Sequence, residues 1–306
     1  MFKNFINSNY CLEMAKEEKK RKIVPEILKM ILVILLGLIV SAVSSMFPAV
    51  CGFFYNQYQF TEVEFLCASL YTTIGTSAFF LYFCHKFQKR DLESLGFKLD
   101  GFLKEYGIGL LIGLIAMTVV AIVGWIFNAF DTVTVNKIEF KWIIAFFFGF
   151  VLQGMSEEIV CRGYIMTTFI RRHSVLSGII INSLVFMLMH GTNTGYGIIP
   201  AINMILFSVF ASLYMIQTEN IWGVSAIHAI WNFAQGCIFG FSVSGASALP
   251  SIFSFSYETN NVLNGGEFGP EGGLIVMAVN LVLIAMCVIK QNRKETNQNI
   301  EELHNG

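Results

Sequence analysis

Residues 142–170 read WIIAFFFGFVLQGMSEEIVCRGYIMTTFI, and this stretch decides the fold of the chain. It is apolar and long enough to cross a bilayer as a helix. Three charged residues, Glu157, Glu158 and Arg162, lie in its middle. Ionisable side chains are costly inside a membrane, so those found there usually face a protein interior or a wet cavity and serve a function. The chemistry of this protein is therefore expected at this point.

The composition of the whole chain indicates a membrane protein. Hydrophobic residues make up 55% of its 306 residues and charged residues 13%, about half the ~25% of a soluble domain. The mean hydropathy is +0.63. We predict an all-α polytopic membrane protein in which each span approaches the ~20 apolar residues that a bilayer requires. Eight spans are predicted, at about 27–47, 64–85, 107–129, 142–168, 174–190, 199–217, 222–243 and 272–290.

The distribution of Lys and Arg predicts how these spans are oriented, because cytoplasmic loops are enriched in both residues. With eight spans, one side of the membrane has only Lys137 and Lys141, and Arg162 lies within a span. All other cations fall on the opposite side: Lys3, Lys16, Lys19, Lys20, Arg21, Lys22, Lys29, Lys86, Lys89, Arg90, Lys98, Lys104, Arg171, Arg172, Lys290, Arg293 and Lys294. Both termini are therefore expected in the cytoplasm. The many Ile, Phe, Asn and Lys residues suggest an AT-rich bacterial genome and hence a bacterial plasma membrane.

The spans divide the chain into segments, with the site expected on the fourth to seventh helices. These segments are a cytoplasmic arm at 1–26, the first three spans at 27–140 with a cytoplasmic interfacial segment at 86–106, a catalytic core at 141–243, an extracytoplasmic loop at 244–271, the last span at 272–290 and a cytoplasmic tail at 291–306. The loop at 244–271 is interpreted as a linker, with a mobile lid as the alternative.

Several functions are not indicated by the sequence. A net charge of −1 without a basic, aromatic-interleaved patch argues against nucleic acid as a partner. The seven cysteines have no paired spacing and fall mostly inside spans, which is typical of small packing residues. The expected partners are the lipid bilayer and a peptide or membrane-protein substrate. Nothing in the sequence indicates an oligomeric state.

Helical spacing places the polar residues of the core on defined faces. Glu158 and Arg162 are four residues apart and share a face, whereas Glu157 is rotated by ~100° and stays free for another role. Two intramembrane histidines, His190 and His228, are expected on the fifth and seventh spans. Each has a partner four residues away: Phe186 precedes His190, and Asn232 follows His228.

Counting along the helices predicts that these polar residues meet. Glu157 lies sixteen residues before His173, and His190 lies sixteen residues after Ser174. At ~1.5 Å per residue, both are about 24 Å from the turn between the fourth and fifth spans. His228 is about seven residues, or roughly 10 Å, inside its own span. The cluster is therefore expected in the cytoplasmic half of the membrane.

Such a cluster is suited to activating water. A carboxylate in a low-dielectric pocket can act as a general base, and a histidine can share the same water. A second histidine together with an Asn amide can donate hydrogen bonds to an oxyanion. Glu and His are also competent zinc ligands, although the sequence contains no His-Glu-x-x-His motif.

At these residues the chain resembles the CPBP family, also called the Abi or CAAX-protease family, of intramembrane endopeptidases. The family has three helical motifs, Glu-Glu-x-x-x-Arg, Phe-x-x-x-His and His-x-x-x-Asn or Asp. They read EEIVCR at 157–162, FMLMH at 186–190 and HAIWN at 228–232. Residues 142–243 carry the resemblance, and LESLGF at 92–97 is similar to an interfacial segment that often precedes the third span.

The resemblance implies hydrolysis of a peptide bond in a membrane-associated protein or peptide. By this resemblance Glu157 and His190 activate the water, and His228 and Asn232 stabilise the oxyanion. A metalloprotease and a metal-free glutamate mechanism are the competing views of the family. Asn232 suits an oxyanion better than it suits zinc, which slightly favours the metal-free mechanism, and Zn²⁺ stays open as a cofactor. If Zn²⁺ is bound, its ligands are Glu157, His190 and His228.

The remaining motif residues have supporting roles under the same resemblance. Glu158 and Arg162 form a buried pair, and Phe186 belongs to the second motif.

Three other interpretations stay open at this stage. The polar residues could form a network that only holds helices together. The chain could be a catalytically silent immunity or binding protein on the same scaffold. It could also be a proton-coupled transporter that uses Glu and His as a relay, although no inverted repeat supports this.

Overall fold

The computed structural model describes residues 22–48, 50, 60–130, 132–247, 249–256 and 260–305. Most of the expected cytoplasmic arm at 1–26 lies outside the described residues, as do Cys11 and Cys51. The five described cysteines are buried and unpaired, as expected for packing residues.

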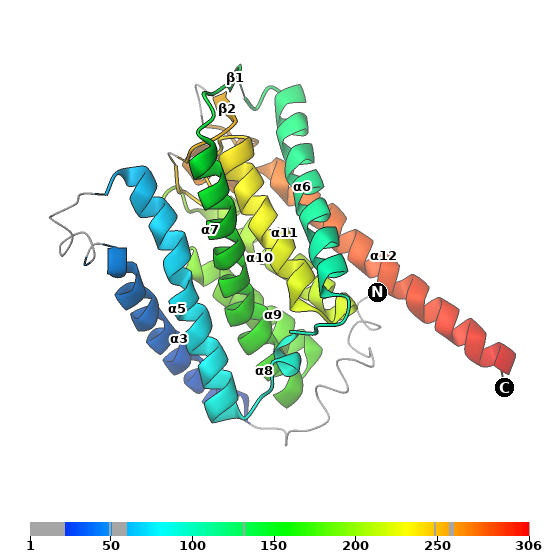
Figure 1. The fold of residues 1–306 in the computed structure, drawn as a ribbon. Coiled ribbons are helices and arrows are strands. Elements are labelled where there is room, and N and C mark those ends of the chain that lie inside the picture. Colours follow the sequence, from blue (N-terminus) through cyan, green and yellow to red (C-terminus); the bar gives the residue numbers. More distant parts are fainter. Residues whose placement is uncertain are drawn as a thin grey trace.

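Helices that run back and forth between the two ends of a bundle make up almost all of the described chain (Figure 1). Three of them, α7, η2 and α8, follow one another without a break, and η2 is a π-helix. The helices are α3 (Ile23–Ser45), α5 (Glu62–Gln88), α6 (Phe102–Ile126), α7 (Phe140–Glu158), η2 (Ile159–Met166), α8 (Thr167–Arg172), α9 (Val175–Met189), α10 (Ile198–Thr218), α11 (Ile221–Phe233) with the π-helical η3 (Ala234–Ile238), and α12 (Leu274–Asn305).

The two ends of the bundle differ in structure. We call the end with residues 127–139, 191–197 and 239–273 the loop end, and the end with residues 89–101, 173–174 and 219–220 the cationic end. A two-stranded antiparallel sheet lies at the loop end, where β1 (Thr132–Val135) pairs with β2 (Phe253–Ser256). Three short 3-10 helices complete the elements: η1 (Glu93–Leu95), η4 (Gly266–Phe268) and η5 (Pro270–Gly272).

The helical architecture confirms the predicted all-α polytopic membrane fold. Within the described residues, six helices are long and apolar enough to cross a membrane: Ile23–Ser45, Glu62–Gln88, Phe102–Ile126, Phe140–Arg172, Ile198–Thr218 and Leu274–Lys294. Helix α9 is also apolar but has only 15 residues, and α11 has 13 before it continues as η3. The count of eight spans therefore remains a prediction.

Glycines let α11 pack closely against α6 and α7, which places its polar residues beside those of α7. A Cβ atom at Gly109 on α6 would lie 2.2 Å from the carbonyl oxygen of Gly223 on α11. A Cβ atom at Gly154 on α7 would lie 2.9 Å from the backbone nitrogen of Ala229. Small residues at such crossings allow two helix backbones to approach closely in membrane proteins. His228 is the residue before Ala229, so this crossing sets its distance from α7.

Capping side chains set where the helices of the core begin. Ser174 accepts a hydrogen bond from the backbone of Ser177 and starts α9 directly after the turn that follows α8. Asn220 accepts one from the backbone of Trp222 and starts α11. Such caps satisfy backbone donors that a helix start leaves unpaired. The first residues of α9 and α11 are therefore fixed at the cationic end, and His190 and His228 follow at set distances along their helices.

Three parts of the structure differ from what the sequence predicts. The strands β1 and β2 lie in segments expected to be loops. Helix α12 extends to Asn305, where a tail was expected from residue 291 onward. The segment 244–271 contributes side chains to the central cavity, so it does more than link two spans.

Candidate active site

Glu158 belongs to a fully buried ion-pair layer. Its Oε1 atom accepts a hydrogen bond from Arg162 Nη1 at 3.0 Å, and neither side chain is accessible to solvent. The same oxygen lies 2.8 Å from His228 Nδ1. Arg162 also donates to the carbonyl oxygen of Ser208 at 3.2 Å, and its guanidinium stacks 4.9 Å from the centre of the Phe186 ring. This layer joins α7, η2, α9, α10 and α11.

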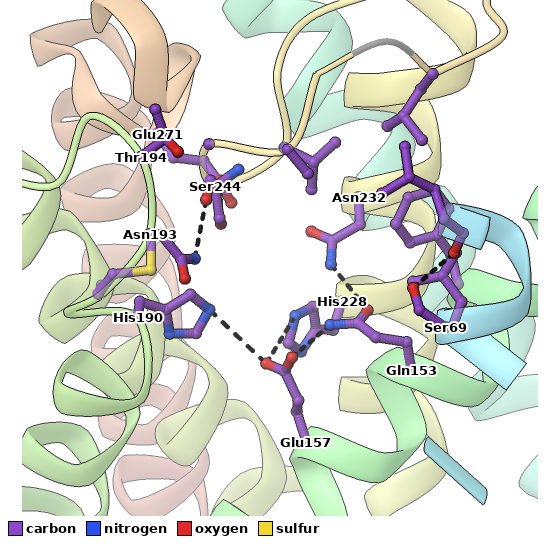
Figure 2. A pocket seen from close by; sticks show the side chains of 18 of the residues that line it. Ser69, Gln153, Glu157, His190, Asn193, Thr194, His228, Asn232, Ser244 and Glu271 are labelled. Atoms are coloured by element: carbon purple, nitrogen blue, oxygen red, sulfur yellow. Dashed lines mark hydrogen bonds and ion pairs between the residues drawn. The ribbon is translucent and has the colours of Figure 1, made fainter. Parts of the chain in front are cut away.

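Glu157 points the other way, into a cavity (Figure 2). Its Oε1 atom accepts a hydrogen bond from Gln153. Its Oε2 atom is buried and has no hydrogen-bond partner among the described residues. That oxygen lies 3.7 Å from His228 Nε2 and 4.0 Å from His190 Nε2. An unpaired buried oxygen is unfavourable unless a further group binds it, so the geometry leaves a place for a ligand or water.

The hydrogen bonds of the two histidines determine which ring nitrogens face the cavity. His190 Nδ1 lies 2.8 Å from the carbonyl oxygen of Phe186, which can only accept, so Nδ1 carries the proton. His228 Nδ1 faces the Glu158 carboxylate and likewise donates to it. In both rings, Nε2 is therefore the atom directed at Glu157. The Phe186 ring packs against both histidines, with centroids 4.7 and 5.9 Å away.

Asn232 is connected to Glu157 through a residue that the sequence motifs do not include. Asn232 Nδ2 donates to Gln153 Oε1 at 3.1 Å, and Gln153 Nε2 donates to Glu157. Gln153 lies four residues before Glu157 on α7 and so shares its face. That spacing is a signal from which Gln153 could have been predicted.

The cavity above Glu157 has a volume of about 400 Å³. Side chains from α5, α7, α9, α10 and α11 form its walls, and two segments at the loop end complete it. Asn193 donates to the carbonyl oxygen of Ser244 at 2.9 Å, and the Ser244 hydroxyl donates to Glu271 Oε2 at 2.6 Å. Figure 2 shows Asn193, Thr194, Ser244 and Glu271 grouped across the cavity from Gln153. Sequence analysis did not include any of these four in the site.

All seven residues of the three motifs lie in or directly beside this cavity. Glu157, His190, His228 and Asn232 line it together with Phe186, whereas Glu158 and Arg162 lie in the buried layer. Glu157 and His190 are at the same level, as counting from the turn predicts. The roles assigned to these residues remain predictions that the experiments below address.

The residues suited to zinc do not form a metal site as placed. Chemically they are appropriate donors, because both histidines direct Nε2 at a carboxylate while Nδ1 is hydrogen-bonded behind it. In the part of the chain that the structure describes, however, no three His, Cys, Asp or Glu side chains have the arrangement of a metal centre. We therefore derive no chemical step through a metal.

Comparison with known proteins bears on the same segment of the chain. Residues 139–234 match the model of the Rce1-like family, described as type II CAAX prenyl endopeptidase Rce1-like. Searches of curated proteins and of solved structures gave no match. The matched residues contain α7 to α11 and all three motifs. Over this core, which is about a third of the chain, the sequence is therefore similar to the CPBP, or CAAX-protease-like, family.

Proposed function

We propose that this protein hydrolyses a peptide bond of a membrane-associated protein or peptide, with Glu157 and His190 activating the attacking water. One observation carries the proposal. The unpaired Oε2 atom of Glu157 faces Nε2 of two histidines inside a cavity large enough for a peptide backbone. The match of residues 139–234 to a family model of CAAX prenyl endopeptidases supports the same reaction class.

The distances between the acceptors suit one water molecule. An oxygen ~2.8 Å from both Glu157 Oε2 and His190 Nε2, which are 4.0 Å apart, would subtend an angle of about 90°. This is close to the angle between the two hydrogens of water. The carboxylate and the imidazole could thus each accept one hydrogen, which directs an oxygen lone pair away from both groups and into the cavity.

In the proposed reaction, this water oxygen attacks the carbonyl carbon of the scissile bond while Glu157 takes one of its protons. The carbonyl oxygen becomes an oxyanion in the tetrahedral intermediate. When the carbon–nitrogen bond breaks, Glu157 returns the proton to the leaving amine. The products are a carboxylic acid and an amine, so the carboxylate is regenerated at the end of the cycle.

In the proposed mechanism, Asn232 and His228 stabilise the oxyanion. Asn232 uses one amide hydrogen on Gln153 and keeps a second for the cavity. His228 donates from Nδ1 to Glu158, and a proton on its Nε2 would point to the same space. Preorganised donors of this kind typically contribute about 10²–10³-fold each to the rate. The Glu158–Arg162 pair holds His228 in this orientation from below.

The direct test is proteolysis by purified protein in detergent, with a quenched fluorogenic peptide library as substrate. Wild type is compared with Glu157→Ala and with a chelator-treated sample. We expect wild type and chelator-treated protein to cleave and Glu157→Ala to be inactive while still inserting into membranes. Normal cleavage by Glu157→Ala would refute the proposed role. Absence of cleavage by every sample would favour a catalytically silent binding protein.

A further inference from the structure

The cavity is closed on the side that faces the cationic end. Directly beneath Glu157, Glu158 and Arg162 are completely buried, and every residue of η2 is buried as well. Phe186, which forms part of the cavity floor, is 1% exposed. Among the described residues, no side chain from the cationic end lines the cavity. Substrate therefore has no path to Glu157 through the packed core beneath it.

The opposite side of the cavity reaches the surface at the loop end. Its lining includes Thr192 and Thr194, which are both exposed, and residues of a second segment: Val243, Ser244, Gly245, Ala246 and Leu249. Helix α9 ends at Met189, so the chain turns away from the bundle directly after His190 and leaves space above it. The depth of the cluster in the membrane is a separate matter: His228 lies seven residues from the start of α11 at the cationic end, and the expected location in the cytoplasmic half stays a prediction.

The charges of the chain indicate which side of the membrane the loop end faces. The cationic end carries the Lys and Arg residues between α5 and α6 and at the end of α8, whereas the loop end has only Lys137 and Lys141 among the described residues. Cytoplasmic segments are the ones enriched in Lys and Arg. By this rule the loop end, and with it the opening of the cavity, faces away from the cytoplasm.

We propose that the site is loaded from the extracytoplasmic side and that its substrate is an unfolded extracytoplasmic segment, either of a secreted peptide or of a membrane protein. That the bound segment is a substrate rests on the proposed function. The direction of access does not. Thr192 at the rim is only two residues beyond His190, whose Nε2 atom lies 4.0 Å from Glu157. A short extended segment can therefore reach Glu157, whereas a folded domain could not enter a cavity of about 400 Å³.

The direction of access can be tested without any activity, by cysteine labelling of the full-length protein in membranes. Thr192→Cys probes the rim of the cavity, and Glu93→Cys is the matched exposed position at the cationic end. Cys11 and Cys51 are replaced by Ser in both variants, since the five described native cysteines are buried. A membrane-impermeant maleimide should label Thr192→Cys in intact cells and Glu93→Cys only after permeabilisation. The reverse pattern would overturn the proposal.

A second experiment tests the substrate class. The impermeant fluorogenic peptide library is added to sealed right-side-out and inside-out vesicles that contain wild type or Glu157→Ala. We expect cleavage by wild type in right-side-out vesicles only, and its loss when a bulky maleimide occupies Thr192→Cys. Cleavage confined to inside-out vesicles would refute extracytoplasmic loading while leaving the proposed hydrolysis intact. Absence of cleavage even in detergent would count against the proposed function, and the labelling would still decide the direction of access.

Discussion

Glu157 and Glu158 are neighbours in one helix, yet they belong to two different regions of the molecule. Glu158 lies in a dry layer where Arg162 and His228 satisfy its Oε1 atom. Glu157 lines the cavity with its side chain 20% exposed, whereas the Glu158 side chain is 0% exposed. The Oε2 atom of each carboxylate lacks a hydrogen-bond partner among the described residues, but only that of Glu157 faces the cavity. The difference arises from a rotation of ~100° between successive helical residues. We therefore expect different roles for two identical side chains: Glu158 stabilises the packing of the helices, and Glu157 takes part in the proposed reaction.

The largest effect is expected from breaking the buried layer. Arg162→Met leaves the Glu158 carboxylate buried beside His228 without its cation, and removal of one partner from a buried pair costs about 3–5 kcal/mol. Lys98→Met is the matched control, because it breaks a bridge to Glu219 whose side chains are 39% and 35% exposed. Such a surface pair contributes about 0–1 kcal/mol. Thermal unfolding in detergent measures both, and equal shifts would contradict the distinction between the layers.

In the cavity, His190→Ala should reduce cleavage by about 100-fold or more, because it removes one of the two groups that bind the water. Its effect on the unfolding temperature should be smaller than that of Arg162→Met, since the ring loses one neutral hydrogen bond to the Phe186 backbone and its packing on the Phe186 ring but leaves no buried charge unpaired. His85→Ala, at an exposed position near the end of α5, is the control. Cleavage rates of the purified variants provide the measurement. Equal rates for His190→Ala and His85→Ala would remove His190 from the mechanism.

Asn232→Ala tests the oxyanion role on the opposite wall. We expect a loss of about 100-fold in kcat with little change in KM, because the donor acts on charge that develops only in the transition state. Asn193→Ala removes the same kind of amide from the same cavity, where it binds Ser244 and not the catalytic cluster. It should have a much smaller effect on kcat. A loss confined to KM in Asn232→Ala would indicate substrate binding instead.

The smallest effect is expected at Gln153, a positioning residue that acts through Glu157 and Asn232. Gln153→Ala removes a hydrogen bond to a charged group, worth about 1.5 kcal/mol, and so should lower cleavage about tenfold. Gln153→Glu places a second carboxylate beside Glu157 and should be more harmful than Gln153→Ala. Comparing kcat for both variants checks this order. An unchanged rate in Gln153→Ala would show that Glu157 keeps its orientation without this bond.

Much of the core could be predicted from the sequence because its signals are local. Hydropathy marks the helices, and four-residue spacings place Glu158 with Arg162 and His228 with Asn232 on shared faces. Counting from the turn at His173 predicts that Glu157 and His190 lie at one level, and they do approach each other. The same kind of spacing could have identified Gln153.

The parts that could not be predicted depend on contacts between distant segments. Thr132–Val135 and Phe253–Ser256 are four residues each and form strands only because they pair with one another. Ser244 and Glu271 reach the cavity through hydrogen bonds that join Asn193, Ser244 and Glu271 across the two loop-end segments 191–197 and 239–273. No local pattern encodes such contacts.

The most direct test of the account compares Glu157→Gln with Glu158→Gln in one preparation, measuring both cleavage and unfolding temperature. Each change replaces a carboxylate by an amide of nearly the same shape. We predict that Glu157→Gln keeps the wild-type unfolding temperature and loses cleavage by about 100-fold or more, whereas Glu158→Gln unfolds at a clearly lower temperature. Wild-type cleavage by Glu157→Gln, or a loss of stability there and not in Glu158→Gln, would contradict the division of roles between the two residues.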